Sequence, residues 1–360
     1  MNETMENFRK KLKSSQATIP VIAILIALII GAVVMLIGGY NPIVAYQSLV
    51  LKIFGSTYDM GETVRAFIPL LLSGFAVAVA SKAGIFNIGV DGQIIMGAVS
   101  SLLVGTLIDL PPIIHGIVAI LVGIIAGGLW GILIASLKTK FGINEVISSI
   151  MLNYIALYLS HMLIKSFAAQ EGTARSSLIK GSASIGFPSL NNLFGGARIH
   201  WGFVIIPFII FGFYYFFEKT RWGYETKTVG LNADAANYSG MHVNGILIRT
   251  MFISGALGGL IGALDTLGVY GYVAIVSSTS GVGFDGIAIA LLGGNSTLGT
   301  TLSGILIGAL DYGSQGMQFG AGVPSEIIGI VISLIIFFVA APGIVKALLP
   351  KKKTLKKEVE

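Results

Sequence analysis

Long apolar stretches separated by short polar segments run along almost the whole chain. A helix needs about 20 apolar residues to cross a bilayer, so each stretch is a candidate membrane-spanning helix. The candidates lie at roughly 19–39, 64–82, 88–108, 112–137, 145–166, 201–217, 248–267, 285–296, 298–315 and 323–345. The pattern predicts an all-α polytopic membrane protein with about ten transmembrane helices.

Two of these stretches are irregular. A helix over the segment 285–296 would be only about 18 Å long, at about 1.5 Å per residue. The hydrocarbon core is roughly 30 Å thick, so this segment predicts a half-helix that does not cross the membrane. The segment 83–92 (AGIFNIGVDG) interrupts an apolar run with glycine, asparagine and aspartate, which predicts a break before a helix that continues from Gln93. Broken backbone cannot face lipid, and both breaks must therefore line protein or a watery cavity.

The two breaks carry similar signals. Ser73-Gly74 precedes the GVDG of residues 89–92, and Ser254-Gly255 precedes the GFDG of residues 283–286. If the halves are related, they form an inverted repeat, which is a common plan of transporters. Four matching positions also arise by chance in glycine-rich sequence, and chance is the alternative reading.

The composition excludes a soluble enzyme. Hydrophobic residues make up 54% of the 360 residues and charged residues only 11%, against roughly 25% charged in soluble domains. The absence of cysteine excludes disulfides and thiolate chemistry. The histidines have no metal-ligand spacing, so we expect no metal site and structural roles for His115, His161, His200 and His242. The chain holds 48 glycines, most of which we expect to pack helices closely at small-xxx-small pairs such as Gly123/Gly127, Gly127/Gly131, Gly255/Gly259 and Gly304/Gly308.

Basic residues predict the orientation. With the N-terminus in the cytoplasm, 17 of the 23 lysines and arginines fall on the inner face, as the positive-inside rule requires. Both termini are then cytoplasmic and the number of crossings is even. The first apolar run is too long for a signal peptide and predicts a retained anchor. The expected layout is a cytoplasmic tail (1–18), an extra N-terminal helix with an outer loop (19–63), a first half of the membrane domain (64–217), a cytoplasmic loop (218–247), a second half (248–345) and a basic cytoplasmic tail (346–360).

Polar residues inside apolar segments are candidate pathway residues, because burying them in a membrane is expensive. Asn144 and Glu145 begin a helix, where capping explains them equally well. Asp91 and Asp285 could likewise cap half-helices. Asn153 and Ser149 share a helix face, and a neutral amide suits hydrogen bonding of a neutral solute. The candidate substrate pathway consists of Phe86, Asn87, Asp91, Gln93, Ser149, Asn153, Tyr154, Asp285 and Asn295.

The inner loop contains the segment 234–240, DAANYSG, which predicts a short helix. It is similar to the EAA-x-x-x-G element by which permeases of ATP-binding cassette (ABC) importers dock onto their ATPase, although aspartate stands in place of the usual glutamate. The candidate coupling residues are Asp234, Ala235, Ala236 and Gly240. A surface helix without that role is the alternative.

Three further segments carry a wider resemblance: GIFNIGVDGQIIMGA (84–98), NEVISSIMLNYIA (144–156) and FDGIAIALLGGNSTLGT (284–300). With them the chain, from about residue 60 to 345, resembles the ABC importer permeases for branched-chain amino acids, ribose-type sugars and nucleosides, and most of all the larger permease of bacterial nucleoside importers. The resemblance implies alternating access in a bacterial cytoplasmic membrane. It also implies three partners: a cytoplasmic ABC ATPase, a second homologous permease and an extracytoplasmic substrate-binding lipoprotein.

The chain has no Gly-Lys pair and hence no Walker A loop, so we expect a transport subunit that is not an enzyme, binds no cofactor and leaves ATP to its partner.

The outer loop 167–200 is a candidate docking surface for the binding protein, or simply a connector. Simple sugars and branched-chain amino acids are the alternative solutes. An ion-coupled secondary transporter, with Asp91, Asp285 and Asp311 as cation or proton sites, is the alternative transport class. A membrane-embedded enzyme would need a catalytic constellation, and the sequence shows none. Most basic residues lie in the predicted cytoplasmic loops and tails, where they set the membrane orientation. We therefore expect no nucleic-acid partner.

Overall fold

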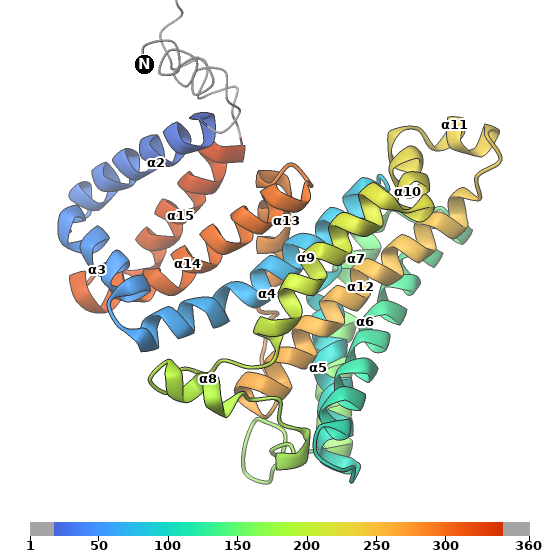
Figure 1. The fold of residues 1–360 in the computed structure, drawn as a ribbon, viewed down its shortest axis with the longest axis horizontal. Helices are drawn as coiled ribbons and strands as arrows, with labels where there is room; N and C mark the ends of the chain where they lie inside the picture. The colour runs from blue at the N-terminus through green and yellow to red at the C-terminus, as the bar shows by residue number, and fades with distance from the viewer. Residues whose placement is uncertain (1–17, 341–360) are drawn as a thin grey trace, which may run out of the picture. The chain divides into compact units, whose positions relative to one another are not determined.

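The computed structural model describes residues 18–340, and every regular element in that range is a helix (Figure 1). Contacts divide the chain into two compact units. One combines the chain ends, Met1–Leu51 and Gly313–Glu360, and the other is Lys52–Tyr312. The chain passes from one unit to the other within helices α3 (Pro42–Phe54) and α14 (Thr297–Ala321). The predicted cytoplasmic tails lie outside the described residues.

In the unit of the chain ends, α2 (Thr18–Ile37) packs against α15 (Ser325–Ala340). Its core contains Met35, Ala45, Met317, Val323 and Ile328. The Tyr46 hydroxyl donates a hydrogen bond to the Leu28 carbonyl at 2.6 Å, which ties α3 to α2. The expected outer loop after the first span is therefore replaced in part by a helix, because α3 buries Ala45 on this core.

The larger unit is a bundle of long apolar helices. These are α4 (Thr57–Lys82), α5 (Val90–Leu107), α6 (Ile114–Phe141), α7 (Glu145–Phe167), α9 (Gly202–Lys219) and α12 (Val243–Asp265). Helix α12 contacts α4, α5 and α6, and it lies alongside α6 in Figure 1. The first turn of α7 is capped by the Asn144 side chain, whose oxygen accepts a hydrogen bond from the Val146 amide at 2.8 Å; the predicted cap is confirmed.

Glycines let α6 and α12 approach to backbone contact. A Cβ atom on Gly127 would lie 2.5 Å from the Gly259 Cα, and a Cβ on Gly123 would lie 3.0 Å from the Gly97 carbonyl oxygen on α5. A Cβ atom at Gly127 would therefore force the two backbones apart, and one at Gly123 would press on α5. The predicted close packing of small residues is confirmed at this three-helix contact.

Six helices of the described part are long and apolar enough to span a membrane, and shorter apolar helices cover Ile22–Ile37, Pro42–Phe54, Val282–Leu292 and Ser325–Phe338. The count of ten crossings stays a prediction. Helix α13 (Val282–Leu292) has only 11 residues, which confirms the predicted short helix. It follows a π-helical turn (Thr266–Tyr270) at the end of α12 and an irregular segment.

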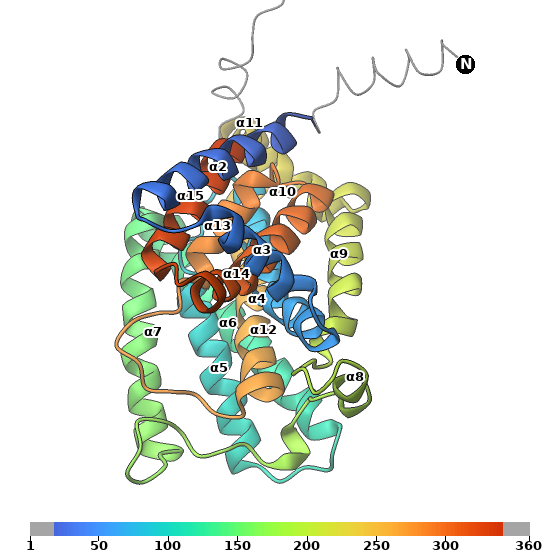
Figure 2. The ribbon, with the colours of Figure 1, turned by 90° about the vertical axis from the view of Figure 1, so that its left-hand side faces the viewer.

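Connecting segments gather at the two ends of the bundle. Helices α10 (Arg221–Leu231) and α11 (Ala233–Tyr238) lie at the end where α12 begins, and α8 (Pro188–Leu193) lies at the opposite end (Figures 1 and 2). The end with α10 and α11 contains the predicted inner loop, and the end with α8 contains the predicted outer loop.

Candidate functional site

The first break is a segment that turns back along α4. After Gly84, residues 85–89 leave the helical conformation, and α5 begins at Val90, three residues before the predicted Gln93. Ser254 of α12 fixes its course: its hydroxyl donates to the Ala76 carbonyl at 2.6 Å and accepts from the Asn87 amide at 2.8 Å. Asn87 therefore lies level with Ala76, about 9 Å along the α4 axis from Lys82 at a rise of about 1.5 Å per residue.

Amide side chains satisfy the backbone of this break. The Asn87 Oδ1 atom accepts from the Gly89 amide at 2.9 Å, and the Asn87 Nδ2 atom donates to Gln93 Oε1 at 3.1 Å. From α7, the Asn153 Nδ2 atom donates to the Ile88 carbonyl at 3.0 Å, while its Oδ1 accepts from the Gly92 amide at 2.8 Å. Unpaired backbone groups are costly inside a membrane, so these amides hold the break in place.

The second break, before α13, is held by a residue that follows the first break. The start of α13 has no side-chain cap of its own. Instead the Asp91 carboxylate, in the first turn of α5, accepts from the Gly283 amide at 3.1 Å and from the Ser280 hydroxyl at 3.5 Å. The Ser73 hydroxyl of α4 donates to the Val282 carbonyl at 2.8 Å. Asp91 thus caps the other half-helix, and Asp285 caps neither.

We call the residues Asn87, Asp91, Gln93, Asn153 and Ser254 the broken-helix junction. All five are at least 95% buried within this chain. Ser149, also fully buried, lies beside it, since a Cβ on Gly89 would lie 3.5 Å from its hydroxyl. A carboxylate placed between two helix N-termini is electrostatically favoured, because both termini carry partial positive charge.

The other predicted pathway residues lie elsewhere. Phe86, Tyr154 and Asp285 are exposed on the surface of the unit. Asn295, in the turn between α13 and α14, donates to the Ser81 hydroxyl at 2.9 Å, at the end of α4. Of the nine predicted residues, five are therefore buried at or beside the junction, Asn295 is half-buried, and three are exposed.

The predicted inner loop contains the two short helices α10 and α11, and we call residues 220–242 the α10–α11 segment. Thr220 caps α10 by accepting from the Gly223 amide at 3.1 Å. Glu225 pairs with Arg221 at 2.8 Å and with Arg249 of α12 at 3.3 Å. Partial burial raises the pKa of Glu225, but the hydrogen bonds from the two arginines lower it more, so the pKa stays below its usual value. The segment is thereby attached to α12.

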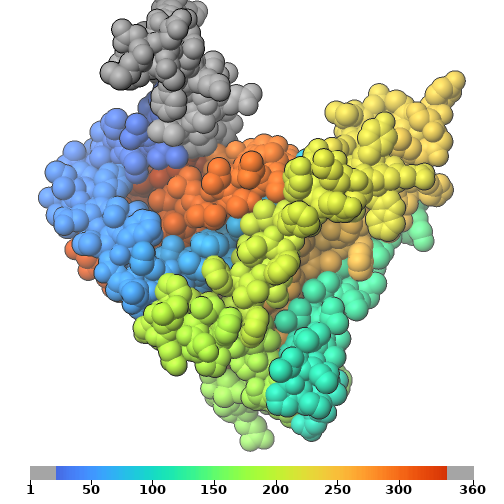
Figure 3. All heavy atoms as spheres, viewed as in Figure 1, coloured from blue at the N-terminus to red at the C-terminus, as the bar shows by residue number. Residues whose placement is uncertain are grey.

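Helix α11 confirms the predicted short helix at 234–240. The Asn232 side chain caps it by accepting from the Ala235 amide at 3.0 Å. Ala236 is fully buried, whereas Tyr238 is 96% exposed. Asp234, Ala235 and Gly240 are exposed, and Gly240 has a φ of +83°. Figure 3 shows this helix projecting from the surface at the yellow end of the bundle. Of the four predicted coupling residues, three are accessible and Ala236 packs inward.

At the opposite end, a buried carboxylate that the sequence did not single out holds the outer loop. Glu62 of α4 is 1% exposed and accepts from the Arg198 backbone amide at 2.8 Å and from its guanidinium at 3.0 Å. Arg65 bonds to the same carboxylate at 2.7 Å. The signal that could have revealed it is the Glu62–Arg65 pair three residues apart just before an apolar run. The loop 168–200 is thus fastened to α4.

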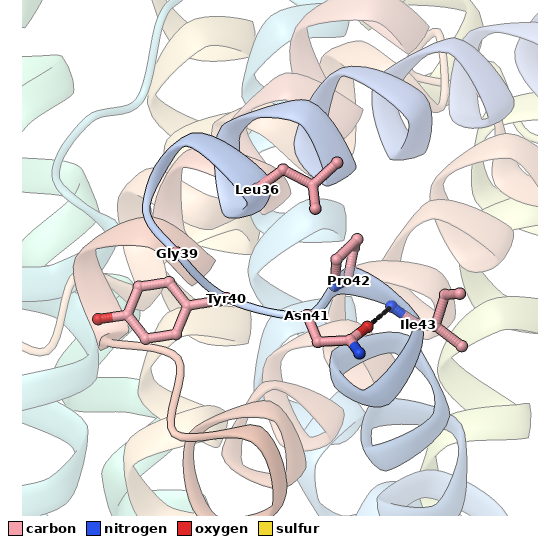
Figure 4. Close-up of a pocket in the computed structure, with 6 residues that line it drawn as sticks. All are labelled: Leu36, Gly39, Tyr40, Asn41, Pro42 and Ile43. Carbon is pink, nitrogen blue, oxygen red and sulfur yellow. Dashed lines mark hydrogen bonds between the residues drawn. The ribbon is translucent and has the colours of Figure 1, made fainter.

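A pocket lies in the unit of the chain ends. It is an open hollow of about 480 Å³ at the turn between α2 and α3, lined by Leu36, Gly39, Tyr40, Asn41, Pro42 and Ile43 (Figure 4). None of the predicted pathway residues lines it. Among residues 18–340, no group of acidic or histidine side chains could hold a metal ion.

Comparison with known proteins decides the family. The model of the branched-chain amino acid transport system permease component matches residues 60–340. The chain belongs to this permease family. As a member, with several apolar helices, it is a multi-pass membrane protein.

Relatives at 31–40% identity cover at least 89% of this permease. It is 40% identical to the guanosine ABC transporter permease NupP of Bacillus subtilis, over 94% of this chain and 97% of the relative. It is 35% identical to the nucleoside ABC transporter permease NupB of Lactococcus lactis, over 96% of each chain. It is 31% identical to a glucose ABC transporter permease of Haloferax volcanii, over 89% of this chain and 86% of the relative. No solved structure gives a significant match.

Proposed function

We propose that this permease moves nucleosides into the cell as the transmembrane subunit of an ABC importer, by alternating access. The observation that carries the proposal is its 40% identity to a guanosine permease over nearly the full length of both chains. A second nucleoside permease at 35% identity supports the same solute class. The glucose permease is a more distant relative at 31% identity, so simple sugars are the weaker alternative.

The partners we propose follow from the family. A cytoplasmic ABC ATPase would bind and hydrolyse ATP, and an extracytoplasmic lipoprotein would deliver the solute. A second, homologous permease would complete the membrane part as a heterodimer. The fastened loop 168–200 is a suitable surface for the lipoprotein, because a preformed surface loses little conformational entropy on binding.

The α10–α11 segment is the proposed contact with the ATPase. Aromatic side chains are enriched at protein interfaces, and α11 presents the exposed ring of Tyr238. Leu231, 88% exposed, precedes this helix. Ala236 supports this surface from below by packing into a core with Ile246 and Met251. Because Glu225 and Arg249 join the segment to α12, a displacement of α11 would move α12 with it.

The exposed polar residues are the better candidates for the solute pathway. Asp285 lies on an exposed face of α13 beside Phe284, which is 51% exposed. A carboxylate at membrane depth does not face lipid, so this face suits a watery cavity or the second permease. The buried junction would then shape the pathway rather than contact the solute.

The packing supports an inverted repeat. Helix α4 packs with the short helix α13, as α12 packs with α5. Ser73 of α4 bonds to the start of α13, and Ser254 of α12 bonds to the break before α5. We propose that the two halves are related in this way and that both termini are cytoplasmic, as the basic residues predict.

Uptake by the reconstituted complex tests the function. Vesicles that contain the permease with its ATPase, second permease and lipoprotein should accumulate labelled guanosine in the presence of ATP, at least tenfold above vesicles without ATP. Excess unlabelled guanosine should compete, whereas glucose and leucine should not. Accumulation by this chain alone under an ion gradient would instead establish the secondary transporter.

A surface variant tests the ATPase contact. Tyr238→Ala should reduce ATPase binding and guanosine uptake at least fivefold, because it removes the most exposed aromatic side chain of α11. Tyr215→Ala, at a 53% exposed tyrosine of α9, is the matched control and should retain both. Normal ATPase binding by Tyr238→Ala would remove α11 from the interface.

A further inference from the structure

The α10–α11 segment touches the end of α4 through a glycine. Gly230 is the penultimate residue of α10. A Cβ atom there would collide with the Lys82 carbonyl oxygen and would lie 2.9 Å from the Lys82 carbonyl carbon and 3.0 Å from the Gly84 nitrogen. The α10 backbone therefore rests directly on the backbone at the end of α4, with no side chain between them.

The residue on the other side of this contact is also a glycine, and it starts the first break. Gly84 has a φ of +74°, a conformation that other residues rarely adopt. A Cβ atom on Gly84 would lie 3.3 Å from the Gly230 Cα. Only two residues separate Gly84 from Asn87, and the Ile85 amide bonds back to the Ala80 carbonyl at 3.2 Å. A displacement of the Gly84 backbone would therefore reach Asn87, the nearest residue of the broken-helix junction, through only three residues of chain.

The second break reaches the same end of α4. Asn295, at the turn after α13, bonds to Ser81 at 2.9 Å, one residue before Lys82. Lys82 itself lies over the ring of Phe217 at the end of α9, with its Nζ atom 5.0 Å from the ring centre. Residues 81–84 thus contact α9, α10 and the turn between α13 and α14, and they lead into the break before α5.

We propose that Gly230 and Gly84 are positioning residues for transport, and that their backbone contact transmits displacement of the α10–α11 segment to the broken-helix junction. The inference rests on the proposed function, since it requires an ATPase that displaces the segment. A direct backbone contact suits this role because close-packed groups transmit displacement, whereas a flexible side chain absorbs part of it. When the α10–α11 segment is displaced, the Glu225–Arg249 ion pair would move α12. The contact between Gly230 and Gly84 would move the break before α5 relative to α12.

The test is the number of ATP molecules hydrolysed per guanosine transported by the reconstituted importer. Gly230→Ala forces α10 away from Lys82 and should raise this ratio at least tenfold while ATPase binding persists. The ratio is measured on purified complexes of permease and ATPase, so that unassembled ATPase does not add to the ATP count. Gly212→Ala, at an α9 glycine with nothing within 4 Å of its Cβ position, is the control and should leave the ratio unchanged.

A milder variant keeps the test decisive if Gly230→Ala fails to insert. Gly84→Asn retains a residue that tolerates positive φ and places its Cβ 3.3 Å from Gly230, so it should raise the ratio at least threefold. An unchanged ratio in whichever variant inserts would overturn the transmission role. Failure of the unsubstituted importer to take up guanosine would instead overturn the proposed function.

Discussion

The amide of Asn153 shows how a membrane-buried polar residue serves its own backbone. Its position mid-span among apolar residues indicates a special role, and hydrogen bonding of a solute was one expectation. The structure buries its side chain to 5% exposure, with both ends of the amide bonded to the break before α5. The residue type and its depth could be predicted, but its partners could not, since Ile88 and Gly92 are more than 60 residues away in sequence.

Removing this amide should destabilise the permease without changing its solute. Asn153→Leu leaves the Ile88 carbonyl and the Gly92 amide unpaired, and each buried unpaired group costs about 1–3 kcal/mol. We expect a lower midpoint of thermal unfolding in detergent and an unchanged preference for guanosine in the protein that remains folded. Asn244→Leu, at an exposed residue of α12, is the control. Equal midpoints for both variants would show that the amide does not hold the break.

At the scale of helices, glycine content predicts close approach but not which helices meet. The pairs at Gly123/Gly127 and Gly255/Gly259 were predicted as packing signals, and α6 and α12 do meet there. Gly97 of α5 completes the contact, and it begins a further small-xxx-small pair with Ser101, which was not among the predicted pairs. Packing of this kind depends on complementary surfaces of two helices, and a single helix sequence specifies only its own surface.

A larger side chain at this contact should prevent correct assembly. Gly127→Val would overlap the backbone of Gly255 and Gly259, and the helices would have to separate. We expect at least a fivefold loss of monodisperse protein on size-exclusion chromatography after detergent extraction. Gly212→Val on α9, where space is open, should behave like the unsubstituted permease. A normal yield of Gly127→Val would contradict the close contact.

At the scale of the whole molecule, the charge distribution predicts that the α10–α11 segment and the loop 168–200 face opposite sides of the membrane. The bundle agrees in placing them at opposite ends (Figure 2). Because the chain contains no cysteine, single cysteines can report the orientation without a background signal.

Labelling of single cysteines in intact cells should therefore distinguish the two ends. Glu171→Cys should react with a membrane-impermeant maleimide from outside, whereas Tyr238→Cys and Lys356→Cys should react only after the membrane is permeabilised. Lys356 tests the predicted cytoplasmic C-terminus. Reaction of Tyr238→Cys in intact cells would reverse the orientation and would also remove the ATPase contact from α11.

The sequence by itself determined the membrane class, the positions of most helices, the two breaks and the short helix α11, because hydropathy, glycine and capping signals are local. The tertiary structure decided how the breaks are held: Asp91 caps the second half-helix, Asn153 supports the first, and Gly230 rests on the end of α4. These contacts join residues 61 to 192 positions apart. No local pattern encodes such a pairing, since it forms only when the packed helices bring each unpaired backbone group to its partner.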